Sequence, residues 1–198
     1  MIEPTIHSRP TYGTLSPRPG RAHLFAADEA GAGAILDMAA AAPVGFFAAS
    51  EILLVSTVPG GETATRLAGL GAAVRVLPTT DALVAAIDEA LAAAGMGLQV
   101  YAAGSEGLIG RVVAAAMAAG LDPSAVATEH RGGLARRVQC VHCKGFMEEV
   151  TTQPVTCAHC GLTLFVRDHY SRRLAAFQGV CINAEDRSEI VPVEEVFR

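Results

Sequence analysis

Between residues 22 and 130, short apolar runs alternate with longer segments in which apolar residues recur every three or four positions. The short runs have the length of buried strands, and the longer segments have the period of helices that cover a sheet. The pattern predicts strands at 23–26, 52–55, 73–77, 98–101 and 125–127, and helices at 30–42, at 63–70, after Pro78 and at 108–119. Because strands that alternate with helices form a parallel sheet covered on both faces, we expect an α/β domain with about five strands.

The regular pattern is absent on both sides of this domain. Residues 1–20 contain four prolines and two glycines and show no apolar period, which predicts an extended arm that is either disordered or laid across a partner. Near the other end, residues 168–177 carry apolar side chains at helical spacing, with Asp168 or Ser171 as a cap, so a short helix is expected there. The predicted domains are an N-terminal arm (1–20), an α/β domain (21–133), a four-cysteine module (134–167) and a C-terminal helix and tail (168–198).

Four of the five cysteines form two Cys-x-x-Cys pairs that are separated by thirteen residues. This spacing predicts one tetrahedral metal site in a zinc ribbon, with the ligands Cys140, Cys143, Cys157 and Cys160. Iron is the alternative metal, because four thiolates also serve a rubredoxin-like electron carrier. His142 and His159 lie between the cysteines at positions that we interpret as exposed, and Cys181 is expected to be a small buried apolar residue.

The charge of the chain is unevenly distributed. A net charge of -5 and a pI near 5.6 argue against a nucleic-acid-binding protein as a whole. Residues 131–173, however, carry seven basic residues against three acidic ones, so a nucleic-acid-binding zinc ribbon stays an alternative. This region also contains our candidate partner contacts, which are Arg167, His169, Tyr170, Arg172 and Arg173.

Neither a secretory signal nor a membrane span is expected, because the first twenty residues lack a charged start followed by an apolar run and no apolar stretch reaches about twenty residues. We therefore expect a soluble cytoplasmic protein, and closely paired cysteines in a reducing compartment are metal ligands more often than disulfides. The sequence also contains no recognisable set of nucleophile and base, no zinc-protease motif and no paired carboxylates. We expect no catalytic residue in this chain.

Residues 100–120 resemble the segment of ferredoxin-reductase-type NAD-binding domains that runs from a strand through Cys-Gly-Pro into a helix. This chain has Ala103-Gly104-Ser105 in place of that tripeptide. The earlier glycine-rich turn at 29–36 is similar to the first turn of the same family, but no Thr-Pro follows it. The resemblance implies a degenerate NAD-binding domain, and it assigns no cofactor-binding residue.

Together, the proline-rich arm, this domain, the CVHC and CAHCG knuckles and the VRDHYSRRLAAFQGV segment resemble the DmmA-type small subunits of bacterial dimethylamine monooxygenase. The resemblance covers nearly the whole chain. It implies a non-catalytic subunit of a complex that converts dimethylamine to methylamine and formaldehyde with electrons from NADPH. It also implies that haem, flavin and iron–sulfur centres belong to the other oxygenase and reductase subunits, which would be the partners of this chain.

Overall fold

The computed structural model describes residues 8–186 and 190–198. These residues divide into two compact units. The α/β unit consists of Tyr12–Gly132, and the ribbon unit consists of Gly133–Arg198 together with the described residues up to Thr11. The chain therefore passes between the two units twice, and each unit is described separately below.

A five-stranded parallel sheet forms the centre of the α/β unit, as the sequence pattern predicted. Its strands, in the spatial order β3-β2-β1-β4-β5, are β1 (Ala22–Asp28), β2 (Ser50–Val55), β3 (Ala73–Leu77), β4 (Leu98–Gly104) and β5 (Val126–His130). The connections contain the helices α1 (Glu29–Ala39), α2 (Glu62–Ala68), α3 (Thr80–Ala93) and α4 (Glu106–Ala118) and the short 3-10 helices η1 (Phe46–Ala49) and η2 (Pro123–Ala125). No helix in the described part of the chain is long and apolar enough to cross a membrane.

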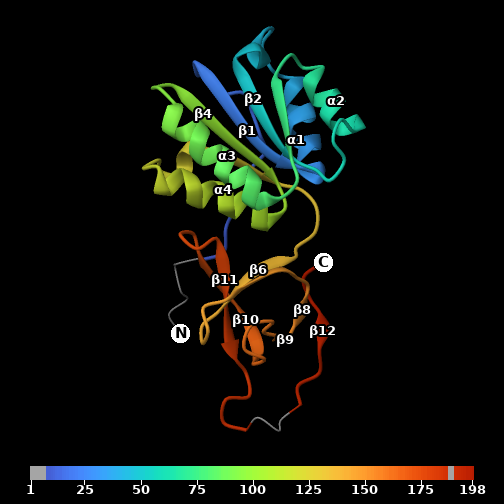
Figure 1. Ribbon diagram of the computed structural model, residues 1–198, viewed down its shortest axis with the longest axis vertical. Coiled ribbons are helices and arrows are strands. Elements are labelled where there is room, and N and C mark those ends of the chain that lie inside the picture. Colours follow the sequence, from blue (N-terminus) through green and yellow to red (C-terminus); the bar gives the residue numbers. More distant parts are fainter. Residues whose placement is uncertain (1–7, 187–189) are drawn as a thin grey trace, which may run out of the picture. The chain divides into compact units, whose positions relative to one another are not determined.

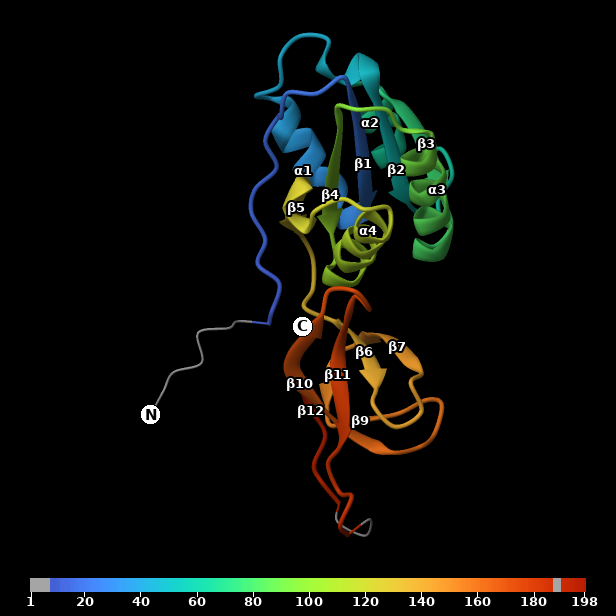
Figure 2. The ribbon, with the colours of Figure 1, turned by 90° about the vertical axis from the view of Figure 1, so that its left-hand side faces the viewer.

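Helices cover both faces of the sheet (Figures 1 and 2), and an apolar layer lies between the helices and each face. Successive side chains of a strand point to opposite faces, so Phe25 and Ala27 of β1 pack with α1 and α2, whereas Leu24 and Ala26 pack with α3 and α4. Both faces of β1 are buried, which explains why its sequence is a continuous apolar run.

Residues 12–20 lie extended along the α/β unit beside β5 (Figure 2). The Gly13 N–H donates to the carbonyl of Thr128 at 3.0 Å, and the Leu15 N–H donates to the buried Glu129 carboxylate at 2.6 Å. The side chain of Leu15 joins the apolar layer of α1 and α2. The arm therefore covers the edge strand β5, which would otherwise expose backbone groups. Residues 1–7 of the predicted arm lie outside the described residues.

His23 makes the stability of the α/β unit depend on pH. Its ring is buried on β1, with its centroid 4.1 Å from that of Phe46, and burial lowers the pKa of His23 below its ordinary value of 6.5. The unfolded chain therefore binds a proton at a higher pH than the folded chain, so we expect the free energy of unfolding to fall as the pH drops below about 6.5. Thermal unfolding measured between pH 5 and 8 tests this expectation. In a His23→Phe variant, the stability should depend less on pH than in the wild type. If the pH dependence of the two proteins were the same, other titrating groups would be its cause.

The ribbon unit contains a mixed sheet in the order β7-β6-β11-β10-β9. Strands β6 and β11 are parallel, and the other neighbours are antiparallel. The strands are β6 (Arg136–Cys140), β7 (Phe146–Val150), β9 (Val155–Thr156), β10 (Thr163–Ser171) and β11 (Ala176–Cys181), and a separate pair joins β8 (Thr152–Gln153) to β12 (Glu194–Glu195). The small core of this unit includes Val138, Leu164 and Phe177.

The prediction of a helix at 168–177 was wrong, because this segment forms the antiparallel hairpin β10–β11. A ten-residue helix is marginally stable in water, whereas pairing with β6 satisfies the backbone and buries Tyr170 and Phe177 in the ribbon core. The capping residue Ser171 instead accepts the Leu174 N–H at 3.3 Å within the hairpin turn. Gly179 lies in β11, where a Cβ atom would be 2.9 Å from the Val138 side chain.

A buried guanidinium connects the end of the chain to this sheet. Arg136 is 4% exposed and lies between the rings of Phe177 and Phe197, 4.1 Å from each ring centroid. Its NH2 group donates to the carboxylate of Asp168 at 2.7 Å. The faces of aromatic rings attract a cation, and the Asp168 carboxylate compensates the charge of Arg136. Because one of the two rings is that of Phe197, residues 194–198 are part of the folded ribbon unit.

Candidate metal centre

The four cysteines of the two pairs converge in the ribbon unit. All four sulfur atoms lie within 4.8 Å of one another. The Sγ atoms of Cys140 and Cys160 are 3.8 Å apart, and those of Cys143 and Cys157 are 3.7 Å apart. A tetrahedron with zinc–sulfur bonds of about 2.3 Å has edges of about 3.8 Å, so the sulfur positions fit a four-thiolate metal ion.

Each cysteine pair lies in a turn with the same backbone hydrogen bonds. In the first turn the Cys140 N–H donates to the Gly145 carbonyl at 2.9 Å, and in the second the Cys157 N–H donates to the Leu162 carbonyl at 2.8 Å. The residue after each second cysteine is left-handed, with φ of 65° at Lys144 and 74° at Gly161. The two turns therefore present their thiols in equivalent ways, as two zinc knuckles do.

Gly145 has a packing role that the sequence did not reveal. A Cβ atom at this position would lie 2.4 Å from the ring of His159, so only glycine lets the second turn approach the first. His159 is exposed, and its Nε2 atom is 2.7 Å from the Phe146 carbonyl oxygen. Because a carbonyl only accepts, Nε2 carries the hydrogen and donates. His142 is also exposed, so both histidines lie where the sequence placed them.

The surroundings of the thiols favour a bound cation. Burial acts to raise the pKa of Cys157, but the N–H groups of His159 and Cys160 outweigh it and lower the pKa to about 7. For Cys160 the N–H of Leu162 acts to lower the pKa, but burial and the neighbouring thiols raise it to about 12. Four thiols this close cannot all lose their protons by themselves, and a divalent ion would supply the missing positive charge.

The carboxyl edge of the parallel sheet is the second place where a site could lie. The strand order reverses between β1 and β4, and nucleotides bind α/β sheets at such a point. Here the carboxylate of Asp28 occupies that position. It accepts the N–H of Gly31 at the start of α1 and the N–H of Ser105 at the start of α4, both at 2.8 Å. The N-termini of α1 and α4 would attract an anion, and a carboxylate of the protein itself already occupies that position.

The glycines at this edge serve close packing. A Cβ atom on Gly31 would lie 2.0 Å from the Ala103 carbonyl oxygen, and one on Gly104 would lie 2.3 Å from the Asp28 carboxylate. The arm covers more of the edge, since the Tyr12 hydroxyl donates to Glu106 at 3.0 Å and the Tyr12 ring stacks on His130. Sequence reasoning missed Asp28, although an acidic residue directly after the first strand was a visible signal against phosphate binding.

We therefore expect that NADPH does not bind this chain. A nucleotide would have to displace the Asp28 carboxylate and place its phosphates beside Glu29 and Glu106. A ligand present at 100 times its Kd stabilises a protein by about 2.7 kcal/mol, which would raise the Tm of a unit of this size by roughly 10 °C. We expect a change below about 1 °C in differential scanning fluorimetry with millimolar NADPH, using inorganic salt of equal ionic strength as the control. A saturable rise in Tm would contradict this expectation.

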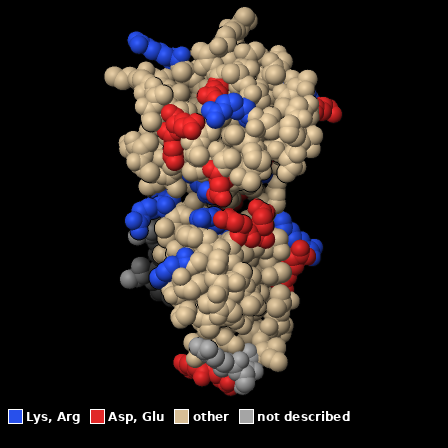
Figure 3. Space-filling model, in the orientation of Figure 1, with Lys and Arg blue, Asp and Glu red and all other residues tan. Residues whose placement is uncertain are grey.

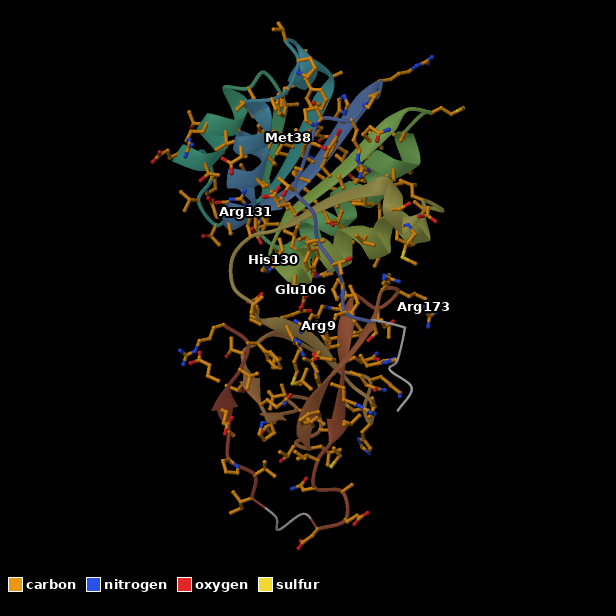
Figure 4. All side chains as sticks on the ribbon, turned by 180° about the vertical axis from the view of Figure 1, so that it is seen from behind. Arg9, Met38, Glu106, His130, Arg131 and Arg173 are labelled. Atoms are coloured by element: carbon orange, nitrogen blue, oxygen red, sulfur yellow. The ribbon has the colours of Figure 1, made fainter. Side chains whose placement is uncertain are left out.

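The candidate partner contacts divide into two groups. Tyr170 is 9% exposed and packs edge-on against Phe177, with ring centroids 4.9 Å apart, so its side chain belongs to the ribbon core. Arg167 and His169 are exposed on β10, and Arg172 and Arg173 are exposed in the hairpin turn. Figure 4 shows Arg173 pointing away from the turn.

Two family models match the chain. Residues 4–126 match the N-terminal domain, and residues 137–180 the C-terminal domain, of "Dimethylamine monooxygenase subunit DmmA-like" proteins. The chain is 34% identical over 145 residues to the "Heme-dependent oxidative N-demethylase delta subunit" of Ectopseudomonas mendocina (strain ymp), covering 70% of this chain and 83% of that protein. Among solved structures, an intact type IV self-sufficient cytochrome P450 monooxygenase aligns at 22% identity with a TM-score of 0.42, over 65% of this chain and 18% of that one. A likeness this weak says nothing about function.

Proposed function

This chain belongs to the DmmA-like family of dimethylamine monooxygenase subunits, and from this premise we propose that it is a non-catalytic subunit of an oxygenase complex. The proposed reaction of the complex is the NADPH-driven oxidation of dimethylamine to methylamine and formaldehyde. The name of the relative, a subunit of a haem-dependent demethylase, supports a complex in which other chains carry the haem. In this proposal the metal site of this chain has a structural role.

We assign zinc to the four-cysteine site, with Cys140, Cys143, Cys157 and Cys160 as its ligands. The observation that carries this proposal is the sulfur spacing, because four thiolates at the corners of one tetrahedron leave no open position for a substrate or water. Zinc bound in this way would hold the two knuckles together and so maintain the surface that the ribbon unit presents. Cys181 is only partly buried, so the expectation of a buried residue was wrong; it lies outside the cluster, with its sulfur 3.6 Å from the Asn183 side chain.

Two observations support a subunit without its own redox chemistry. The segment that resembles a reductase has Ala103-Gly104-Ser105 where the related domains have Cys-Gly-Pro, and Asp28 fills the adjacent nucleotide position. Haem, flavin and iron–sulfur centres therefore belong to the partner subunits in this proposal. We place the complex in the cytoplasm, where thiols stay reduced and available to a metal.

Metal analysis separates this proposal from a rubredoxin-like electron carrier. Purified protein should contain one zinc per chain, and a Cys140→Ser variant should lose it. A visible absorption that bleaches on reduction would instead show iron in the same site and make the chain an electron carrier. Capture of the tagged chain from its native host should recover the haem-containing oxygenase subunit and the reductase subunit; recovery of neither would refute the proposed membership of the complex.

A further inference from the structure

The β10–β11 hairpin carries a group of exposed cations. We define the hairpin surface as Phe165, Arg167, His169, Arg172 and Arg173, all of which are exposed. We propose that the hairpin surface docks against an acidic surface of a partner protein. The identity of this partner as another oxygenase subunit rests on the proposed function. The acidic character of the partner surface is inferred from the hairpin alone.

The arginines of the hairpin surface are not compensated by acidic groups that the structure describes. Asp168, the acidic residue of β10, already accepts from the buried Arg136 at 2.7 Å, and Glu148 of β7 accepts from Arg137 at 2.7 Å. Among residues 8–186 and 190–198, no ion pair includes Arg167, Arg172 or Arg173. An acidic partner would therefore gain interactions with these side chains without breaking existing ones.

The hairpin turn holds its arginines on a preorganised backbone. The turn is closed by the Leu174 N–H bond to Ser171 and by the Ala175 N–H bond to the Arg172 carbonyl at 3.3 Å. The Arg137 side chain donates to the Leu174 carbonyl, and Tyr170 and Phe177 fix the base of the turn in the core. A turn that is already ordered loses little conformational entropy when it binds.

Charge is unevenly distributed on the ribbon unit. On the face that Figure 3 shows, blue side chains lie at the end of the ribbon unit where the β10–β11 hairpin turns, with a red group beside them, and further red side chains lie beyond the opposite end of β11. In the sequence, residues 182–198 carry five acidic residues and two basic ones, the reverse of the balance in 131–173. The acidic tail would repel an acidic surface, so such a surface would approach the hairpin turn in preference to the tail.

The same distribution disfavours nucleic acid as the occupant. Affinity for nucleic acid comes largely from many phosphate contacts, about 6–10 in well-studied cases, and the hairpin surface offers three arginines and a histidine. Phe165, on the part of β10 away from the turn, adds an apolar side chain that is 40% exposed, and such a side chain suits the apolar part of a protein interface.

Retention of the full-length chain on immobilised poly-L-glutamate tests the proposal without a known partner. At about 50 mM salt, where screening is weak, the wild-type chain should be retained despite its net charge of -5 and should elute as salt rises. An Arg172→Glu/Arg173→Glu variant should pass through. An Arg21→Glu/Arg66→Glu variant makes the same charge change at two exposed arginines of the α/β unit and should be retained like the wild type.

Three results would overturn the proposal: wild-type protein that is not retained, equal loss of retention in both variants, or retention on single-stranded DNA cellulose to higher salt than on poly-L-glutamate. The same variants then enter binding measurements with the co-expressed oxygenase subunits. The hairpin variant should associate at least tenfold more slowly with unchanged metal content, and binding as fast as the wild type would also overturn the proposal. If the wild type is retained by poly-L-glutamate but binds no oxygenase subunit, the hairpin surface stands and the proposed function fails.

Discussion

Removal of the metal from the four-cysteine site is expected to unfold the ribbon unit while the parallel sheet stays folded. The core of the ribbon unit is small, and two of its most buried members, Cys140 and Cys157, are themselves proposed ligands. Structural zinc contributes on the order of 10 kcal/mol in zinc-finger peptides, which exceeds what so small a core supplies. Hydrogen exchange after chelation should therefore show lost protection in β6, β7, β10 and β11 and retained protection in β1, β2 and β4.

A Cys157→Ser variant should reproduce the effect of chelation, whereas a Cys181→Ser variant should keep both metal and protection because that sulfur lies outside the cluster. Zinc added back to the chelated protein should restore protection. If protection in β6 and β11 survived complete removal of metal, the ribbon unit would be stable by packing alone and the structural role of the site would be refuted.

Gly31→Ala is expected to destabilise the α/β unit by about 2 kcal/mol or more, close to the upper range for an overpacked core. The new Cβ atom would lie 2.0 Å from the carbonyl oxygen of Ala103, and that oxygen belongs to the backbone of β4 and cannot move cheaply. Helix α1 would have to shift away from the sheet, which would also stretch the bond from the Gly31 N–H to the Asp28 carboxylate. Thermal unfolding should show a Tm lowered by roughly 6 °C or more.

Gly33 in the same helix provides the matched control, because a Cβ atom there meets no atom within 4 Å. Gly33→Ala should stabilise the unit by about 0.5–1 kcal/mol, since alanine is the better helix former. Similar effects of the two substitutions would show that Gly31 is not required for packing, and the turn would again be open to a nucleotide interpretation.

The α/β fold could be predicted from the sequence because each of its elements has a clear period. The strands β1, β2 and β4 are buried on both faces or nearly so, and the apolar runs of the five strands are separated by helices with an apolar stripe. Strand boundaries were less certain: β5 continues through the polar residues Thr128 and Glu129 to His130, because Glu129 is buried by its bond to the arm. No local pattern in the strand indicates that partner.

The hairpin at 163–181 shows where local patterns fail. Tyr170, Leu174 and Phe177 have helical spacing, but they also fit a hairpin in which Tyr170 and Phe177 face each other. The choice depends on β6, which lies more than thirty residues earlier in the chain and pairs with β11. The position of Phe197 against Arg136 likewise depends on a contact that sequence spacing cannot show.

The candidate metal centre was predictable because zinc knuckles are local: two cysteines two residues apart already define half of a site. The surroundings of the site were not, since His159 packs on Gly145 across the two knuckles. The carboxyl edge of the sheet shows the reverse case. Its glycines resembled a nucleotide-binding turn in the sequence. In the structure, the space beside them holds the Asp28 carboxylate, which accepts hydrogen bonds from two helix N-termini.

The most direct test of the central claim is co-purification of the tagged chain from its native host, with metal and cofactor analysis of each separated subunit. The account predicts a complex in which a haem-containing oxygenase subunit accompanies this chain, and in which this chain itself holds one zinc and no chromophore. The account would be contradicted if the chain purified alone, or if iron with a reducible visible absorption were found in its four-cysteine site.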